Sequence, residues 1–353
     1  HPMKDTGDNL AHAQVRPPEE PAAAPEAPPP AGPRKQRRSR VWPIFVLILL
    51  AVIAGAAWFV MREVRTSALQ AEFFNRLSRQ LTYKVEPGAS PAGAIRYPQH
   101  GPYDERLGYA SLPDFIGKLN ARDYTVTAQA RMSPKMVELA DMGVFATYQE
   151  KNRAGLTILD WRAAPLFSAI YPERAFNGFA EAPPALVQSL LFIENRELLD
   201  PGTPERNPAV EWDRLSKAVL DKGLNMVGGH RGGGGSTLAT QIEKYRHSED
   251  GRTSSMKDKL FQMLSASLRS YQDGENTMAM RRKIVVSYLN TVPLSAKSGF
   301  GEVNGIGDGM WVWYGRNFDE VKAQLTPKLD QPGSALAYKQ ALSLLIAQRR
   351  PSH

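Results

Sequence analysis

The stretch of sequence with the most distinctive chemistry is MVGGHRGGGGSTLATQIEKYRHS, residues 226–248. A glycine run ends at Gly235, and the residues after it have helical spacing, with Ser236 and Thr237 as candidates for the N-cap. A helix that begins here presents unpaired backbone N–H groups and the positive end of its dipole, and both favour an anion. A Walker-type phosphate loop is excluded, because that motif requires lysine where Gly235 stands. The stretch therefore predicts an anion site at a helix N-terminus.

Polar side chains continue along one side of this predicted helix. Lys244 and Tyr245 follow Gln241 at spacings of three and four residues, and residues so spaced are neighbours on a helix surface. A flexible linker fits this pattern poorly, because the residues after the glycines favour a helix. We expect this side of the helix to hold a diphosphate or a sugar.

A candidate proton acceptor stands upstream, in PPALVQSLLFIENRELL, residues 183–199. Leu186, Leu190 and Ile193 form an apolar helical stripe, and Glu194 follows directly after it. A carboxylate at the end of such a run could lie in a partly desolvated cleft and accept a proton. The alternative is a surface glutamate on an amphipathic helix, and the pattern alone favours that alternative.

The N-terminal part of the chain predicts a membrane anchor. Residues 1–40 form a tail rich in proline and alanine that ends in the basic block RKQRRSR, and we expect this tail to be disordered. Residues 1–2 precede a methionine and are interpreted as the remainder of an expression tag. Residues 41–61 carry no charge and are long enough to cross a hydrocarbon core of about 30 Å. The positive-inside rule places the tail in the cytoplasm and residues 62–353 outside it.

Composition limits the function classes. The chain has 353 residues, of which 42% are hydrophobic and 23% charged, with a net charge of +8 and no cysteine. Disulfides and thiolate metal sites are therefore excluded, and none of the six histidines pairs at HxH or HxxxH spacing. The positive charge suits nucleic acid, an anionic membrane surface or a phosphorylated substrate. A location outside the cytoplasm argues against nucleic acid as a partner.

Residues 62–165 predict a stalk and a small α+β module. Residues 66–83 read as a helix that leaves the membrane, and Pro87 and Gly88 interrupt it. Residues 112–119 have helical spacing, whereas residues 124–129 alternate between apolar and polar as in a half-buried strand.

Six motifs after residue 165 resemble, in order, those of glycosyltransferase family 51. They are FIENREL, GGSTLATQIEK, KDKLFQM, RRKIVVSYLNTVPL, GDGMWVWYG and ALSLLIAQRRPS. This family contains the peptidoglycan glycosyltransferases of class A penicillin-binding proteins and the monofunctional transglycosylases. The resemblance implies a mainly α, lysozyme-like domain over residues 166–353, on the outer face of the bacterial cytoplasmic membrane. RRPSH ends inside a family motif, so we expect the natural protein to continue.

The resemblance also implies a reaction and the residues that perform it. The family polymerises lipid II, an undecaprenyl-pyrophosphoryl disaccharide-pentapeptide, with inversion at the anomeric carbon and release of undecaprenyl pyrophosphate. Glu194 matches the family's catalytic base. The residues that match its diphosphate-binding set are Ser236, Thr237, Gln241, Lys244 and Lys259.

The resemblance further implies partners and cofactors. The partners would be lipid II, glycan strands, the lipid bilayer and other cell-wall synthesis proteins. No cofactor is required, although members of the family often work with a divalent cation such as Mg²⁺ near the diphosphate.

Several positions depart from the family pattern. The second catalytic carboxylate of the family is matched by Gln262, which can donate and accept hydrogen bonds but carries no charge. Asn195 stands in place of an aspartate, and Val286 in place of an acidic residue. An alternative hypothesis is therefore a weak or inactive relative that binds lipid II or glycan, or that scaffolds a cell-wall complex. A lysozyme-like hydrolase is a third hypothesis, which the glycine-Ser-Thr-Lys segment disfavours.

Overall fold

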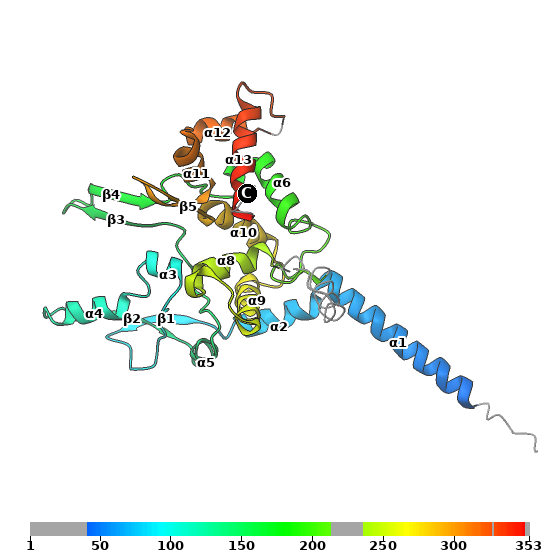
Figure 1. The fold of residues 1–353 in the computed structure, drawn as a ribbon. Helices are drawn as coiled ribbons and strands as arrows, with labels where there is room; N and C mark the ends of the chain where they lie inside the picture. Colours follow the sequence, from blue (N-terminus) through cyan, green and yellow to red (C-terminus); the bar gives the residue numbers. More distant parts are fainter. Residues whose placement is uncertain (1–40, 213–235, 327, 350–353) are drawn as a thin grey trace, which may run out of the picture. The chain divides into compact units, whose positions relative to one another are not determined.

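A computed structural model describes residues 41–212, 236–326 and 328–349 (Figure 1). The predicted tail and the glycine run of residues 228–235 lie outside the described residues. The chain divides into two compact units, one up to Ala54 and one from Gly55 onward. The described part of the first unit is a single helical segment, whereas the second unit holds the rest of the fold.

The predicted membrane segment is helical. Helix α1 spans Val41–Thr66, so it runs five residues beyond the predicted end at Met61. Its stretch Trp42–Thr66 is long and apolar enough to cross a membrane, and the side chains of this stretch are not buried in the protein. Length and composition are therefore consistent with a single-pass anchor.

The next part of the chain forms short helices and one small antiparallel sheet. Its helices are α2 (Ala68–Ser78), α3 (Pro102–Arg106), α4 (Leu112–Asn120) and α5 (Pro134–Met142), and its strands are β1 (Tyr83–Pro87) and β2 (Ala128–Met132). The predicted α+β character and the helix at residues 112–119 are confirmed. The predicted strand is displaced, because the strand begins only at Ala128, where pairing with Pro87 starts. Alternation of side chains alone could not specify that register.

These elements share contacts with a later helix, α9 (Met256–Ser270). The side chain of Asn75 donates to the carbonyl of Tyr271 (2.9 Å), and Ser78 donates to the carbonyl of Leu268 (2.9 Å). Leu268 is fully buried and packs in an apolar cluster with Met136 and Leu139 of α5. The apolar core of the segment that follows the membrane helix therefore includes side chains of α9.

A β-hairpin connects this part to the remaining helices. Strand β3 (Ala154–Leu159) pairs antiparallel with β4 (Pro165–Tyr171). The predicted domain boundary at residue 165 falls at the start of β4, inside the hairpin. The division at this boundary stays a prediction.

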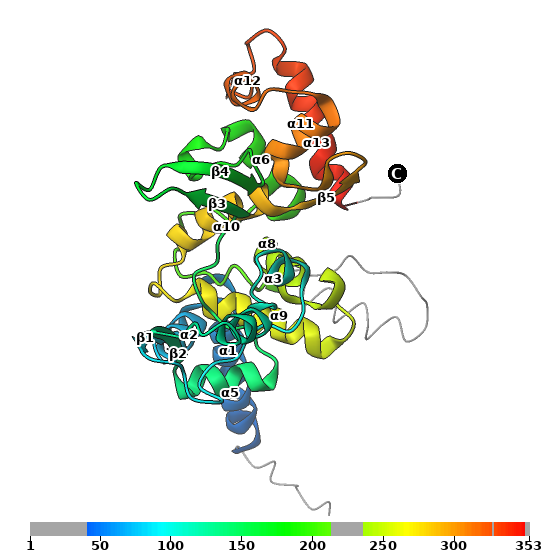
Figure 2. The same ribbon diagram turned by 90° about the vertical axis from the view of Figure 1, so that its left-hand side faces the viewer.

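The rest of the chain is mainly helical, as predicted. It contains η1 (Phe179–Glu181), α6 (Pro184–Glu194), α8 (Leu238–His247), η3 (Glu249–Gly251), α9, α10 (Met278–Thr291), β5 (Pro293–Lys297), β6 (Gly301–Asn304), α11 (Gly305–Tyr314), α12 (Phe318–Gln324) and α13 (Ser334–Arg349). Strands β5 and β6 form a second hairpin. Figure 2 shows α11, α12 and α13 next to one another, with α10 beneath α11.

The main core lies between α6, α8, α10, α11 and α13. Fully buried apolar side chains from these helices include Leu190, Leu238, Leu289 and Met310. A Cβ at Gly305 would lie 2.3 Å from the carbonyl oxygen of Asn290, so α11 can approach α10 this closely only because the residue is glycine.

The motif Tyr-Leu-Asn at the end of α10 has a visible structural role. The side-chain oxygen of Asn290 accepts from the backbone N–H of Phe176 (2.8 Å), and its amide donates to the carbonyl of the same residue (2.8 Å). Asn290 is buried, so these two bonds satisfy polar groups that would otherwise be costly to bury. The motif thereby fixes the segment that leads into α6.

Candidate active site

Helix α6 ends at Glu194, as the apolar stripe predicts. Pro184 begins the helix, where a missing N–H costs nothing, and Leu186 and Leu190 are buried along its inner side. Glu194 itself is only 6% exposed, and Asn195 then leaves the helix with an extended backbone. The interpretation of Glu194 as a surface glutamate is therefore wrong, because the helix turns this side chain inward.

Helix α8 begins where the sequence places a helix start. Thr237 is the N-cap, and its hydroxyl accepts from the backbone N–H of Thr240 (3.2 Å), while the hydroxyl of Thr240 accepts from the N–H of Thr237 (2.9 Å). This reciprocal capping box leaves Ser236 just outside the helix. Both threonines are almost fully buried, so Thr237 holds the start of the helix in place.

The inner side of α8 meets Glu194. The amide of Gln241 donates to Glu194 Oε2 (2.9 Å), and both side chains are buried. Lys244 lies one turn further along and is half-buried. Burial lowers the pKa of Lys244, and the negative charge of Glu194 partly offsets this effect. The carboxylate and the ammonium are therefore close enough to interact electrostatically.

A second ammonium joins this cluster from α9. Lys259 Nζ donates to the hydroxyl of Ser236 (2.6 Å). Burial lowers the pKa of Lys259 to about 8, and the positive charge of Lys244 adds to this shift. Two half-buried ammonium groups repel each other, and such a pair is typical of a site that binds an anion. We call Glu194, Ser236, Gln241, Lys244 and Lys259 the α6/α8/α9 cluster.

A comparison with known families agrees with this geometry. The family model described as Transglycosylase matches residues 166–353. This chain belongs to the transglycosylase family. The lysozyme-like, mainly α fold predicted for these residues is confirmed by this match. A comparison with curated proteins finds no match for the chain.

Gln262, which the sequence resemblance aligns with the second carboxylate of the family, bonds residues outside the α6/α8/α9 cluster. It is fully buried, and its amide donates to the hydroxyls of Ser248 (2.9 Å) and Thr253 (3.0 Å). Its side-chain oxygen accepts from Thr253 (3.1 Å). These bonds join α9 to the segment after α8. The predicted catalytic role of Gln262 stays a prediction.

Replacing Gln262 by glutamate should destabilise the protein. A carboxylate at this fully buried position cannot donate to Ser248 and Thr253, and burial disfavours its charge. We expect Gln262→Glu to lower the free energy of unfolding by about 1–3 kcal/mol, measured by urea denaturation. Gln80→Glu is the matched control, because Gln80 is exposed. A Gln262→Glu variant as stable as the control would contradict the buried, internally bonded environment of this side chain.

Among the described residues, the cluster has one carboxylate, Glu194, and two ammonium groups, Lys244 and Lys259. The use of a divalent cation stays a prediction. In the described ranges no group of three or more histidine, aspartate or glutamate side chains could hold a metal. Lys244 and Lys259 are the cations that the described part of this cluster offers to a diphosphate.

The pKa of Lys259 predicts how anion binding depends on pH. Below pH 8 the ammonium is charged and attracts an anion, whereas above pH 8 it is increasingly neutral. The dissociation constant of a diphosphate diester should therefore rise, up to about tenfold per pH unit, as the pH increases beyond this value. Isothermal titration calorimetry can measure it, because the diester keeps a constant charge near neutral pH.

Lys259→Arg is the matching variant for this pH dependence. A guanidinium stays protonated throughout the range, so binding of the diester by the variant should depend on pH much less than binding by the wild type. A wild-type dissociation constant that does not change between pH 7 and pH 9.5 would contradict the assignment of Lys259 to the anion site.

Sequence reasoning missed a group of buried charges on the other side of α8. Asp104, Glu150, Glu243, Arg246, His247 and Arg269 form ion pairs with one another. The sequence signal was weak, because Asp104 and Glu150 lie far from α8 along the chain and belong to no motif.

Proposed function

We propose that this transglycosylase polymerises lipid II into glycan strands and releases undecaprenyl pyrophosphate. The observation that supports the proposal is the α6/α8/α9 cluster. In it the buried carboxylate of Glu194 interacts with Gln241 and Lys244, and a second ammonium, Lys259, lies close to Lys244 and bonds Ser236 at the start of α8. A glycosyl transfer from a lipid diphosphate needs these two functions together. It needs a base for the attacking hydroxyl and positive charge for the leaving diphosphate.

Glu194 is the general base in this mechanism. The 4-hydroxyl of the acceptor sugar gives its proton to Glu194 while its oxygen attacks the anomeric carbon of the donor. The bond between that carbon and the diphosphate oxygen breaks on the opposite face, so the configuration inverts. The hydrogen bond from Gln241 (2.9 Å) holds the carboxylate in one orientation during this step.

Lys244 and Lys259 receive the leaving group. The diphosphate gains negative charge as the glycosidic bond breaks, and fixed cations stabilise this charge more in the transition state than in the ground state. Ser236 holds the amine of Lys259 near the start of α8 (2.6 Å). The N-terminus of α8 adds the partial positive charge of its dipole. Thr237 contributes by fixing the position of that N-terminus.

The apolar helix α1 supports a membrane anchor for this enzyme. A lipid-linked donor diffuses in the plane of the bilayer, so a membrane anchor keeps enzyme and substrate in the same layer. The basic block before α1 supports a cytoplasmic N-terminus. We therefore propose a single-pass protein of the bacterial cytoplasmic membrane, with the transglycosylase domain on the outer side. Its further partners are the bilayer, glycan strands and other cell-wall synthesis proteins.

A second candidate function is favoured by Gln262. Because this position lacks the second carboxylate of transglycosylases, the protein could bind lipid II or glycan without polymerising it. Hydrolysis of glycan is disfavoured, because a hydrolase has no use for two lysines at a diphosphate site.

Incubation of the full chain with labelled lipid II tests the proposal. The expected result is a ladder of glycan strands on a gel, which a muramidase digests. Lipid II that binds to the protein but stays unpolymerised would support the second candidate. Cleavage of preformed glycan without polymerisation would support a hydrolase and overturn the proposal.

A further inference from the structure

The segment between α5 and β3 lies against two helices of the transglycosylase domain. We call residues 144–152 the strap; they precede the part of the chain that the family model matches. The backbone N–H of Phe145 donates to the hydroxyl of Ser265 (2.9 Å), and Arg269 donates to the carbonyl of Tyr148 (2.9 Å). Gln272 donates to the carbonyl of Thr147 (3.1 Å). Side chains of α9 and its C-terminal end thus bind the backbone of the strap.

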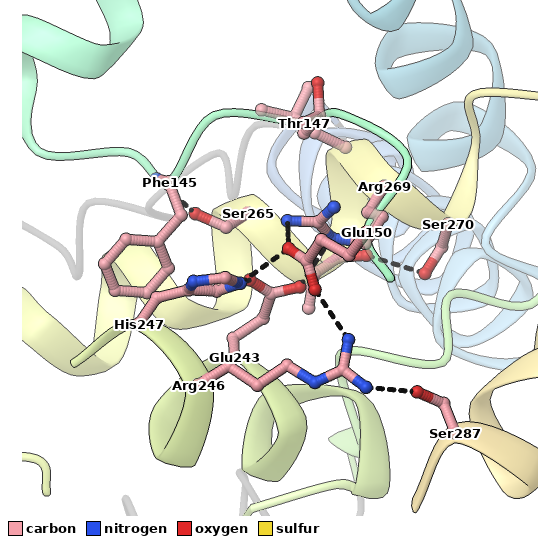
Figure 3. A network of polar contacts seen from close by, with 12 residues as sticks. Phe145, Thr147, Glu150, Glu243, Arg246, His247, Ser265, Arg269, Ser270 and Ser287 are labelled. Atoms are coloured by element: carbon pink, nitrogen blue, oxygen red, sulfur yellow. Dashed lines mark hydrogen bonds and ion pairs between the residues drawn. The ribbon is translucent and has the colours of Figure 1, made fainter. Parts of the chain in front are cut away.

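The strap inserts one carboxylate between α8 and α9, as Figure 3 shows. The side chain of Glu150 is 5% exposed and contacts three cations. Its Oε2 accepts from Arg246 of α8 (2.6 Å), and its Oε1 lies 2.7 Å from Nε2 of His247 and 2.9 Å from Arg269 of α9. No motif of the transglycosylase domain supplies this carboxylate. It comes from the part of the chain that follows the membrane helix.

Two further carboxylates complete the arrangement. Asp104 of α3 contacts Nδ1 of His247 (2.9 Å), and Glu243 of α8 contacts Nε of Arg269 (2.8 Å). Together with Glu150 they balance the three cations Arg246, His247 and Arg269. Burial of so many charged groups is tolerable only when each positive charge is paired with a negative one.

The protonation states agree with this balance. Burial alone would lower the pKa of His247, but the charges of Glu150 and Asp104 raise it to about 10. Burial would likewise raise the pKa of Glu150, but Arg269 and His247 hold it well below its usual range. The groups that face His247 and Glu150 include these same cations and carboxylates, so His247 and Glu150 both stay charged near neutral pH.

The buried charges and the α6/α8/α9 cluster lie on different sides of one short helix. Helix α8 has ten residues. Gln241 and Lys244 face Glu194, whereas Arg246 and His247 contact Glu150 of the strap. Glu243 pairs with Arg269 of α9. A rotation of α8 about its axis would therefore displace both sets of side chains together.

We propose that Glu150 is a positioning residue that fixes the rotation of α8 and thereby places Gln241 and Lys244 next to Glu194. The kinetic consequence of this inference rests on the proposed function. Removal of the Glu150 charge leaves two arginines and a histidine with too few partners, and α8 then loses its anchor to the strap. A small displacement of catalytic groups by a distant substitution can cost about a hundredfold in rate.

Glu150→Gln tests the proposal, with Glu138→Gln of α5 as the matched control, because Glu138 is exposed and its partner is the neighbouring Lys135. In folded protein, kcat for lipid II polymerisation should fall about a hundredfold with a smaller change in KM. The control should keep wild-type kinetics. A Glu150→Gln variant with reduced thermal stability but unchanged kcat would overturn the proposal.

A second measurement needs no turnover. The rate at which an amine-specific reagent acylates Lys259, read by mass spectrometry across pH, reports the pKa of that lysine. The wild-type midpoint is expected at about 8, because burial and then the charge of the nearby Lys244 lower the pKa of Lys259. If α8 rotates in Glu150→Gln, Lys244 moves away and the midpoint rises toward the ordinary value of 10.5. An unchanged midpoint would overturn the proposal, even if the protein polymerised no lipid II.

If Glu150→Gln does not fold, Glu150→Asp is measured in its place. Aspartate keeps the charge but is shorter by one methylene, so it cannot reach all three cations. The expected result is a smaller loss of kcat and a smaller shift of the Lys259 midpoint in the same direction. Wild-type values for both would overturn the proposal.

Discussion

Glu194→Gln is expected to lower the rate of lipid II polymerisation by about 10²–10⁴-fold, the usual contribution of a general base. Glutamine has nearly the shape of glutamate, and its side-chain oxygen can still accept the hydrogen bond from Gln241 that Glu194 Oε2 accepts (2.9 Å). The variant should therefore fold and bind lipid II normally. What it loses is the ability to take the proton of the attacking hydroxyl.

The control for this variant is Glu197→Gln. Glu197 stands three residues further along the chain, is exposed and pairs with Arg206, so its loss should leave polymerisation unchanged. Polymerisation is measured from initial rates, and lipid II binding is measured separately on the same preparations. A Glu194→Gln enzyme with more than a tenth of the wild-type rate would contradict the assignment of Glu194 as the base.

Lys244→Met is expected to lower kcat/KM for lipid II by about 10²–10³-fold, the cost of removing one group that stabilises a developing negative charge. Methionine is a flexible apolar residue of comparable length, so it can fill the half-buried position without leaving a cavity. Of the two lysines of the α6/α8/α9 cluster, Lys259 alone is then left to bind the leaving diphosphate. Much of the loss should appear in kcat, because the charge on the diphosphate grows in the transition state.

Lys257→Met separates this effect from a general loss of positive charge. Lys257 is an exposed lysine of α9, two residues from Lys259, and its ammonium lies over the ring of Phe261. Its replacement should change kcat/KM by less than about twofold, since an exposed charge contributes little. Equal losses in Lys244→Met and Lys257→Met would indicate that the lysines act only through the overall charge of the protein.

Local sequence patterns were sufficient to predict the helices that carry the cluster. The apolar stripe of α6 ends at Glu194, and the serine and threonine after the glycines mark the start of α8. In both cases the signal depends on residues a few positions apart, as in capping and helical periodicity. The spacing of Gln241 and Lys244 then placed both on one side of α8. Burial of Glu194 was not predictable in this way, because it depends on the helices that pack around it.

The features that sequence reasoning missed depend on contacts between distant segments. Glu150 meets Arg246 across almost a hundred residues, and neither side chain belongs to a recognisable pattern. Gln262 could be aligned with the second carboxylate of transglycosylases, but the alignment could not reveal that its amide is bonded to Ser248 and Thr253. The register of β2 likewise depends on its pairing with β1. Propensity and spacing contain no information about such partners.

The most direct test of the central claim is the release of undecaprenyl pyrophosphate during strand growth. The full chain in lipid vesicles is supplied with lipid II, and the lipid product and the new glycosidic bonds are counted over time for wild type and Glu194→Gln. Our account predicts one undecaprenyl pyrophosphate for each bond formed by the wild type, and almost none from the variant. Equal release by both proteins, or none by a wild type that binds lipid II, would contradict it.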